Sequence, residues 1–139
     1  MNDFSDVLIL MVAMTLFSSF TLTSARNFNL SSTDLARSDA EYRAIATAQN
    51  ELDYIKWIDQ PTKLNPTSTN YVFSSYPVSK VNQFGANNRF EEPVNINAES
   101  YLLDEDASIV RYKVIVTVTN TEYTPVISST VSTIKSFAK

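Results

Sequence analysis

The chain of 139 residues contains no cysteine, no histidine and a single glycine, Gly85. The absence of cysteine excludes a disulfide framework and thiolate metal sites, and it leaves the redox compartment open. The absence of histidine removes the commonest general base and the commonest metal ligand. Average usage of about 7% would give roughly ten glycines. The turns must therefore be built from Asn, Asp, Ser and Pro.

Basic residues are also in the minority, and the net charge is −4. Residues 1–60 hold eight acids against four bases, whereas residues 61–139 hold seven of each. The chain shows no basic patch for phosphates, so we expect no nucleic-acid partner. Serine and threonine are abundant, but no Ser–Lys or paired-carboxylate spacing stands out. We therefore expect neither an enzyme nor a cofactor.

The most informative feature is a run of 19 residues without a charge, from Val7 to Ala25. Asp3 and Asp6 precede the run and Arg26 follows it. A hydrocarbon core of about 30 Å needs about 20 apolar helical residues, so the run is just long enough to span one. Its second half is rich in Ser and Thr, which suits a helix packed among other helices better than one that faces lipid alone.

Three interpretations of residues 1–25 remain open. The first is a retained helix in a membrane or a helix bundle. The second is a signal peptide cleaved after Ala25, which the small residues Thr23-Ser24-Ala25 favour but the acidic, Lys- and Arg-free start disfavours. The third is the mature start of a chain whose leader, upstream of Met1, has been removed.

A second helical pattern extends from Ser31 to Pro61, and neither Gly nor Pro occurs before Pro61. Apolar residues recur there at helical spacings: Leu35, Tyr42, Ile45, Ala48, Leu52, Ile55 and Ile58. We expect these residues to face a sheet, and Arg37, Glu41, Arg43, Glu51 and Lys56 to face solvent. Asn and Ser within residues 27–32 leave a break in the helix possible.

The remaining chain favours β structure. Residues 109–119, IVRYKVIVTVT, alternate with period two and place Val110, Tyr112, Val114, Val116 and Val118 on one face. We expect an antiparallel partner over residues 126–137 and further short strands over 101–103 and 71–74. Residues 61–70, 81–97 and 120–125 are predicted to be loops. The predicted class is α+β: a long hydrophobic helix whose amphipathic half packs on a sheet of three or four strands.

Two clusters in the β region offer binding alternatives. Asp104-Glu105-Asp106 could supply oxygen ligands to Ca²⁺, although we favour a solvated acidic turn. Five aromatic residues could bind a sugar or a protein, although we expect them to cover the loop-rich side of the sheet: Tyr71, Phe73, Tyr76, Phe84 and Phe90.

With these parts placed, the chain resembles the type IV pilin superfamily, which includes the pseudopilins. The resemblance lies in the start VLILMVAMTLFSSF, the stretch AEYRAIATAQNELDYIKW and the strand YKVIVTVT with the Ser/Thr-rich segment after it. It implies a leader removed by processing, an inner-membrane precursor and a cell-surface or periplasm-spanning filament. Family members carry an early Glu, and here Asp3 and Asp6 are the nearest acids.

The resemblance divides the chain into an assembly or transmembrane helix (1–30), a continuous amphipathic helix (31–60) and a β head (61–139). Its partners would be copies of itself or other pilin-like subunits. One acid, Asp3 or Asp6, would either stabilise the helix start or pair with the terminal amine of a neighbouring copy. The expected assembly interface is Asp3, Phe4, Asp6, Val7, Leu8, Ile9, Leu10, Val12, Leu16, Phe17 and Phe20. The alternative function is a single-pass, membrane-tethered binding module.

Overall fold

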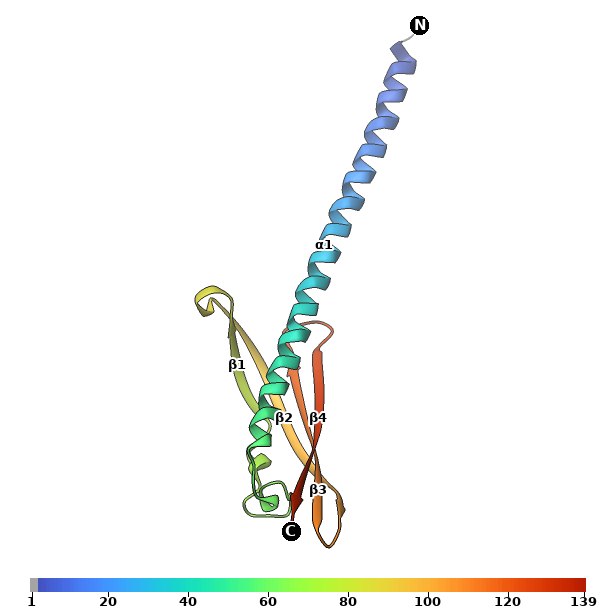
Figure 1. Cartoon of the computed structure of the whole chain (residues 1–139). Helices are drawn as coiled ribbons and strands as arrows, with labels where there is room; N and C mark the ends of the chain where they lie inside the picture. The colour runs from blue at the N-terminus through green and yellow to red at the C-terminus, as the bar shows by residue number, and fades with distance from the viewer. Residues whose placement is uncertain (1–2) are drawn as a thin grey trace. The chain divides into compact units, whose positions relative to one another are not determined.

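A computed structural model describes residues 3–139, with side chains from residue 4 onward. Met1 and the side chain of Asp3 therefore lie outside the described residues. The described residues form one α-helix, short 3-10 helices and a four-stranded sheet (Figure 1): α1 (Asp3–Lys56), β1 (Val78–Phe84), β2 (Phe90–Glu105), β3 (Ile109–Asn120) and β4 (Ile127–Ala138). The fold class is α+β, as predicted.

Helix α1 is continuous over 54 residues, so the break considered at residues 27–32 does not occur. The Thr33 hydroxyl donates to the Asn29 carbonyl at 2.9 Å without displacing the helical hydrogen bonds around it. The helix ends at Lys56, where Trp57 and Ile58 donate to carbonyls three residues back, and Pro61, preceded by the extended Gln60, prevents the helix from resuming. Lys135 Nζ donates to the carbonyl of Lys56 at 2.5 Å, so a charged donor satisfies one of the last helical acceptors.

The chain divides into two compact units, which we call the N-terminal segment (up to Ser38) and the sheet unit (Asp39–Lys139). In the sheet unit the strands follow the order β1-β2-β3-β4, and every neighbouring pair is antiparallel. The core lies between one face of this sheet and residues 40–58. Alternation on β3 is as predicted, because Val110, Tyr112, Val114, Val116 and Val118 are all buried.

Two strand predictions were wrong. Residues 71–74 were expected as a strand, but Val72–Ser75 form a 3-10 helix that inserts Phe73 into the core. Residues 81–97 were expected as a loop, but they contain the end of β1 and the start of β2. The many polar residues of this segment led to the loop prediction. They alternate, however, with Val94, Ile96 and Ala98, which point inward from a half-buried strand.

Proline is tolerated within this strand because of its place in the sheet. Pro93 pairs with Val81 of β1, and the pairing of β2 with β3 begins only at Asn95. Only one neighbouring strand therefore flanks Pro93, at the end of β2 where a missing N–H costs least. A strand with Asn, Glu and Pro on its outer side gives little hydrophobic signal in the sequence.

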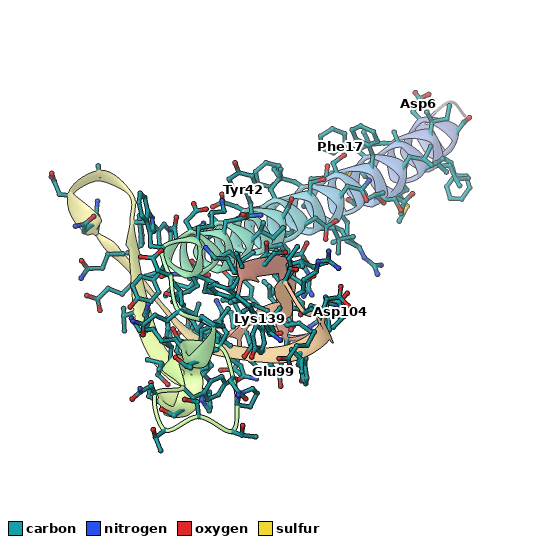
Figure 2. The ribbon with its side chains drawn as sticks, turned by 60° about the horizontal axis from the view of Figure 1, so that its bottom comes forward. Asp6, Phe17, Tyr42, Glu99, Asp104 and Lys139 are labelled. Atoms are coloured by element: carbon teal, nitrogen blue, oxygen red, sulfur yellow. The ribbon has the colours of Figure 1, made fainter. Side chains whose placement is uncertain are left out.

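The buried stripe of α1 also differs from the prediction. Ala48, Leu52, Ile55 and Ile58 are buried as expected, but Leu35, Tyr42 and Ile45 are exposed. Figure 2 shows Tyr42 directed away from the sheet. Ala40 and Ala44 take the inward positions because small side chains allow the helix backbone to approach the sheet closely.

Candidate assembly surface

The N-terminal segment places large apolar side chains in solvent. Figure 2 shows Phe17 extending from the surface of α1. Among the predicted interface residues, the apolar ones are all about half exposed or more: Phe4, Val7, Leu8, Ile9, Leu10, Val12, Leu16, Phe17 and Phe20. Asp6 is also exposed. The structure thus places the predicted residues from Phe4 to Phe20 on one helix and leaves their side chains exposed.

This surface is long and apolar enough to cross a membrane. The helix contains an 18-residue window with a mean hydropathy of 1.9, none of which is buried. Among the described residues it is the one helix that meets these criteria of length and composition. A soluble domain normally keeps its exposed apolar patches far smaller. The N-terminal helix therefore indicates membrane association or secretion.

The hydroxyl groups in the second half of the run do not prevent apolar packing. Thr15 donates to the carbonyl of Met11 at 2.9 Å, Thr21 to Phe17 at 2.8 Å and Thr23 to Ser19 at 2.9 Å. Each hydroxyl proton is thereby satisfied within the helix itself. These threonines can enter a water-free interface without a partner on another helix.

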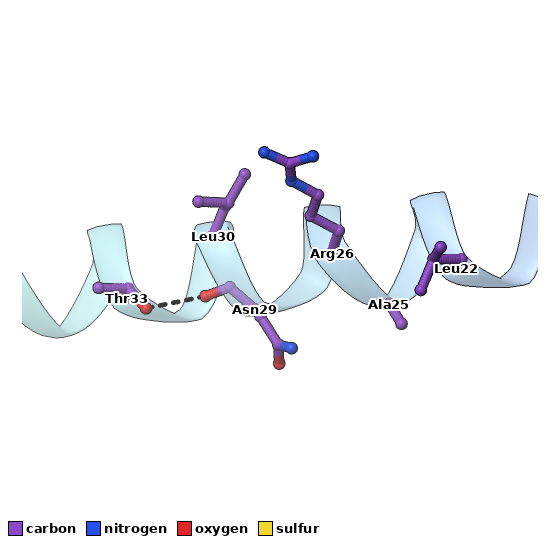
Figure 3. A pocket seen from close by; sticks show the side chains of 6 residues that line it. All are labelled: Leu22, Ala25, Arg26, Asn29, Leu30 and Thr33. Atoms are coloured by element: carbon purple, nitrogen blue, oxygen red, sulfur yellow. Dashed lines mark hydrogen bonds between the residues drawn. The ribbon is translucent and has the colours of Figure 1, made fainter.

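The apolar surface continues beyond the residues that sequence reasoning selected. Leu22 and Phe28 are each 74% exposed and Leu30 is 55% exposed. A shallow recess on the helix surface is lined by Leu22, Ala25, Arg26, Asn29, Leu30 and Thr33. Figure 3 shows Arg26 and Leu30 extending to the same side of the helix. The sequence contained a signal for this extension, because Leu22, Arg26 and Leu30 are spaced by four residues and so share one side of a helix. Arg26 was interpreted only as the end of the uncharged run.

The sheet unit holds a buried polar cluster that the sequence did not predict. Arg43 Nε donates to Glu92 Oε2 at 2.9 Å, and Asn120 Nδ2 donates to Glu92 Oε1 at 2.8 Å. Arg43 also pairs with Asp39, and its Cζ lies 4.0 Å from the centre of the Phe84 ring. The hydrogen bond to Glu92, with the nearby charges, raises the pKa of Arg43 above its ordinary value. Arg43 is therefore charged and turned toward the sheet, whereas the sequence placed it in solvent.

Glu51 was likewise expected in solvent but contacts β1 and the segment before it. It accepts a hydrogen bond from the Tyr76 hydroxyl at 2.9 Å and pairs with Lys80. Only 14% of the Glu51 side chain is exposed. Burial, followed by the hydrogen bond to Glu51, raises the pKa of Tyr76 to about 12. These contacts fix the sheet to α1.

The aromatic residues considered for binding fall into two groups. Phe73 is buried and makes edge contacts with Tyr71 and Tyr76. Phe84 and Phe90 stack on each other at the turn between β1 and β2, with ring centres 5.5 Å apart. The first group belongs to the core, and in the second group Phe84 lies against the Arg43 guanidinium.

Two of the three acidic residues considered for Ca²⁺ are engaged in ion pairs. Asp104 pairs with Arg111 at 2.7 Å and Glu105 pairs with Lys139 at 2.6 Å. Within residues 3–139, no group of three or more acidic side chains is arranged to hold a metal ion. Asp104 therefore connects the two strands of the β2–β3 hairpin, and Glu105 connects β2 to the residue after β4.

Comparison with protein-family models, curated proteins and solved structures found no match to this chain. The architecture itself is pilin-like, since a long N-terminal apolar helix precedes a four-stranded antiparallel sheet that packs on its C-terminal part.

Proposed function

We propose that the protein is a structural subunit of a type IV pilus-like filament and assembles through its hydrophobic N-terminal helix. The observation that carries the proposal is that no residue of the apolar window in α1 is buried. Full burial of a Val, Leu, Ile, Phe or Met side chain contributes about 1.5–3 kcal/mol. Packing of these helices between copies would remove their apolar side chains from water.

The same helix would hold the subunit in the inner membrane before the subunit enters a filament at the cell surface. Its partners would be further copies or other pilin-like subunits. We assign it no catalytic role, because the buried Glu92 and Asn120 are used in the contact with Arg43 of α1 and the buried Ser100 donates to the carbonyl of Leu64. The sheet unit would then form the outer part of the filament.

The test is the substitution Leu10→Asp or Phe17→Asp in the native cells. Either acid would be buried without a partner in the packed helices, so we expect filaments to disappear from the sheared extracellular fraction. A matched control is Thr130→Asp, on the exposed face of β4, which should leave assembly intact. Normal filaments from the Leu10 and Phe17 variants, viewed by electron microscopy, would contradict the proposal.

The alternative is a single-pass module held in a membrane, which the single apolar window of α1 also favours. This alternative predicts a detergent-soluble monomer that stays with the cells. Intact mass and the N-terminal residue of protein in the sheared fraction distinguish the two. Protein beginning at Met1 and recovered in polymers supports the filament, whereas protein found only in membranes as a monomer supports the module. Extracellular protein beginning at Arg26 would indicate cleavage after Ala25.

A further inference from the structure

The N-terminal segment carries two opposite charges at a distinctive separation. Asp6 and Arg26 are the only ionisable side chains between residues 4 and 33. Both are exposed, and neither has an ion-pair partner among the residues that the structure describes. Each charge can therefore be stabilised only by solvent or by a group from outside the chain.

Apolar side chains surround both charges. Leu10 lies one turn beyond Asp6 and is 60% exposed, and Leu22 and Leu30 flank Arg26 in the recess of Figure 3. Any contact that covers these leucines also removes the adjacent charge from water. A charge transferred from water without a partner is strongly unfavourable, so each charge needs a counterion in the packed state.

Helix geometry prevents the two residues from pairing within one chain. Twenty residues at 1.5 Å each place them about 30 Å apart along α1. At about 100° per residue they also differ by about 200° around the axis, so they lie on nearly opposite sides. In two parallel copies with the same orientation, the Asp6 side of one helix faces the Arg26 side of the other. A relative displacement of about 30 Å brings the two charges to one level.

We propose that Asp6 of one copy forms an ion pair with Arg26 of a second copy displaced by about 30 Å along the helix axis. This inference rests on the proposed filament function and specifies the stagger of its subunits. The planar guanidinium can donate two parallel hydrogen bonds to a carboxylate. Such a pair compensates both charges and also fixes the relative position of the two helices. Apolar packing alone allows helices to slide past one another, and the pair would select one register.

Charge reversal tests the pair in the full-length protein in its native cells. We expect Asp6→Arg and Arg26→Asp each to lose filaments, because each places two like charges together. The double variant D6R/R26D restores opposite charges and should restore filaments. Normal assembly by either single variant, or a double variant as defective as the single ones in spite of normal membrane levels, would overturn the proposal.

Crosslinking tests the stagger while both charges stay in place. The chain has no cysteine, so Leu10→Cys with Leu30→Cys introduces two unique thiols with the same separation of 20 residues. We expect a short bismaleimide to convert filaments of this variant into a ladder of covalent oligomers. The control is Leu10→Cys with Ser19→Cys, whose positions also lie on opposite sides of α1 but about 13 Å apart. Crosslinking of the control pair instead of the Leu10/Leu30 pair would overturn the proposed register.

The outcomes separate this inference from the proposed function. Wild-type protein that forms no filament refutes both. Wild-type filaments without a Leu10/Leu30 ladder refute the ion pair and leave the filament function standing. If Arg26→Gln filaments assemble normally and only the membrane retention of the precursor falls, Arg26 binds an anionic lipid headgroup and the pairing between copies is wrong.

Discussion

Arg43 of α1 and Glu92 of β2 form an ion pair at 2.9 Å, although 49 residues separate them in the sequence. Only 4% of the Glu92 side chain and 18% of the Arg43 side chain are exposed. Asn120 donates to the second carboxylate oxygen of Glu92, and the Phe84 ring lies against the guanidinium. One charged group on the helix is thereby joined to β1, β2 and β3 of the sheet.

Removal of one member of this pair should destabilise the sheet unit strongly. Arg43→Met leaves the Glu92 carboxylate buried with Asn120 as its remaining partner, and we expect a loss of about 3–5 kcal/mol in the free energy of unfolding. Glu92→Gln keeps the shape and removes the charge, so its loss should be smaller. Denaturation of the full chain in detergent, followed by circular dichroism, measures both. Asp39→Asn, at an exposed partner of Arg43, is the control and should change stability by less than about 1 kcal/mol.

The alanine stripe of α1 should not accept a larger residue. Ala44 is 2% exposed against the sheet, so Ala44→Leu must displace neighbouring side chains, at a cost of about 1–3 kcal/mol. Ala46 lies on the exposed side of the same turn, and Ala46→Leu should be nearly neutral. A comparison of the two midpoints of thermal unfolding checks this. Equal midpoints would show that the close approach of helix and sheet is not required.

Gly85 should resist substitution because of its backbone conformation and its neighbour. Its φ of +82° lies in a region that L side chains rarely adopt, and a Cβ would lie 2.8 Å from Cδ2 of Phe90. We expect Gly85→Ala to lower the free energy of unfolding by about 1 kcal/mol or more. The exposed neighbour Ala86 offers a control, since Ala86→Ser should have little effect. An unchanged unfolding curve for Gly85→Ala would contradict this account of the β1–β2 turn.

The sheet unit should lose stability at alkaline pH through Tyr76. Its pKa in the folded state is raised from 10.0 to about 12, first by burial and then by the hydrogen bond to Glu51. The folded state therefore holds the phenolic proton more tightly than the unfolded state. The resulting stabilisation is complete below pH 10 and is lost as the pH rises toward 12.

Unfolding measured across this pH range, in parallel with the ultraviolet absorbance of tyrosinate, tests the assignment to Tyr76. Tyr76→Phe should be less stable than the wild type at neutral pH but should show a shallower decline in stability between pH 10 and 12. A decline of the same steepness in both proteins would assign the effect to another group.

The parts of the fold that the sequence predicted are those with a local signal. The helix was predicted because the apolar run, the helical spacing and the lack of Gly and Pro act over neighbouring residues. Strands β3 and β4 were predicted because β-branched residues dominate them, with apolar side chains alternating along β3. The apolar character of residues 4–20 has the same local origin, and their role in assembly stays a prediction.

The failures concern features that depend on distant parts of the chain. Hydrophobic periodicity selected Leu35, Tyr42 and Ile45 for the core, but these side chains are exposed. The sheet comes so close to α1 that the small Ala40 and Ala44 face the core instead. The early part of β2 was missed because its inward residues alternate with Glu, Pro and Asn. The inward Glu92 is stable only because Arg43 reaches it from another element, and no local pattern contains that information.

The same helix that exposes its apolar residues before Thr33 anchors the sheet unit from Ala40 onward, and it contains neither Gly nor Pro to act as a hinge. Between these stretches, residues 34–39 have no buried side chain. If the protein forms the proposed filament, tension would therefore lengthen each subunit first at this turn and a half of helix. Its unwinding from about 1.5 Å to about 3.3 Å per residue would give each subunit roughly 10 Å of reversible extension while the sheet stays folded.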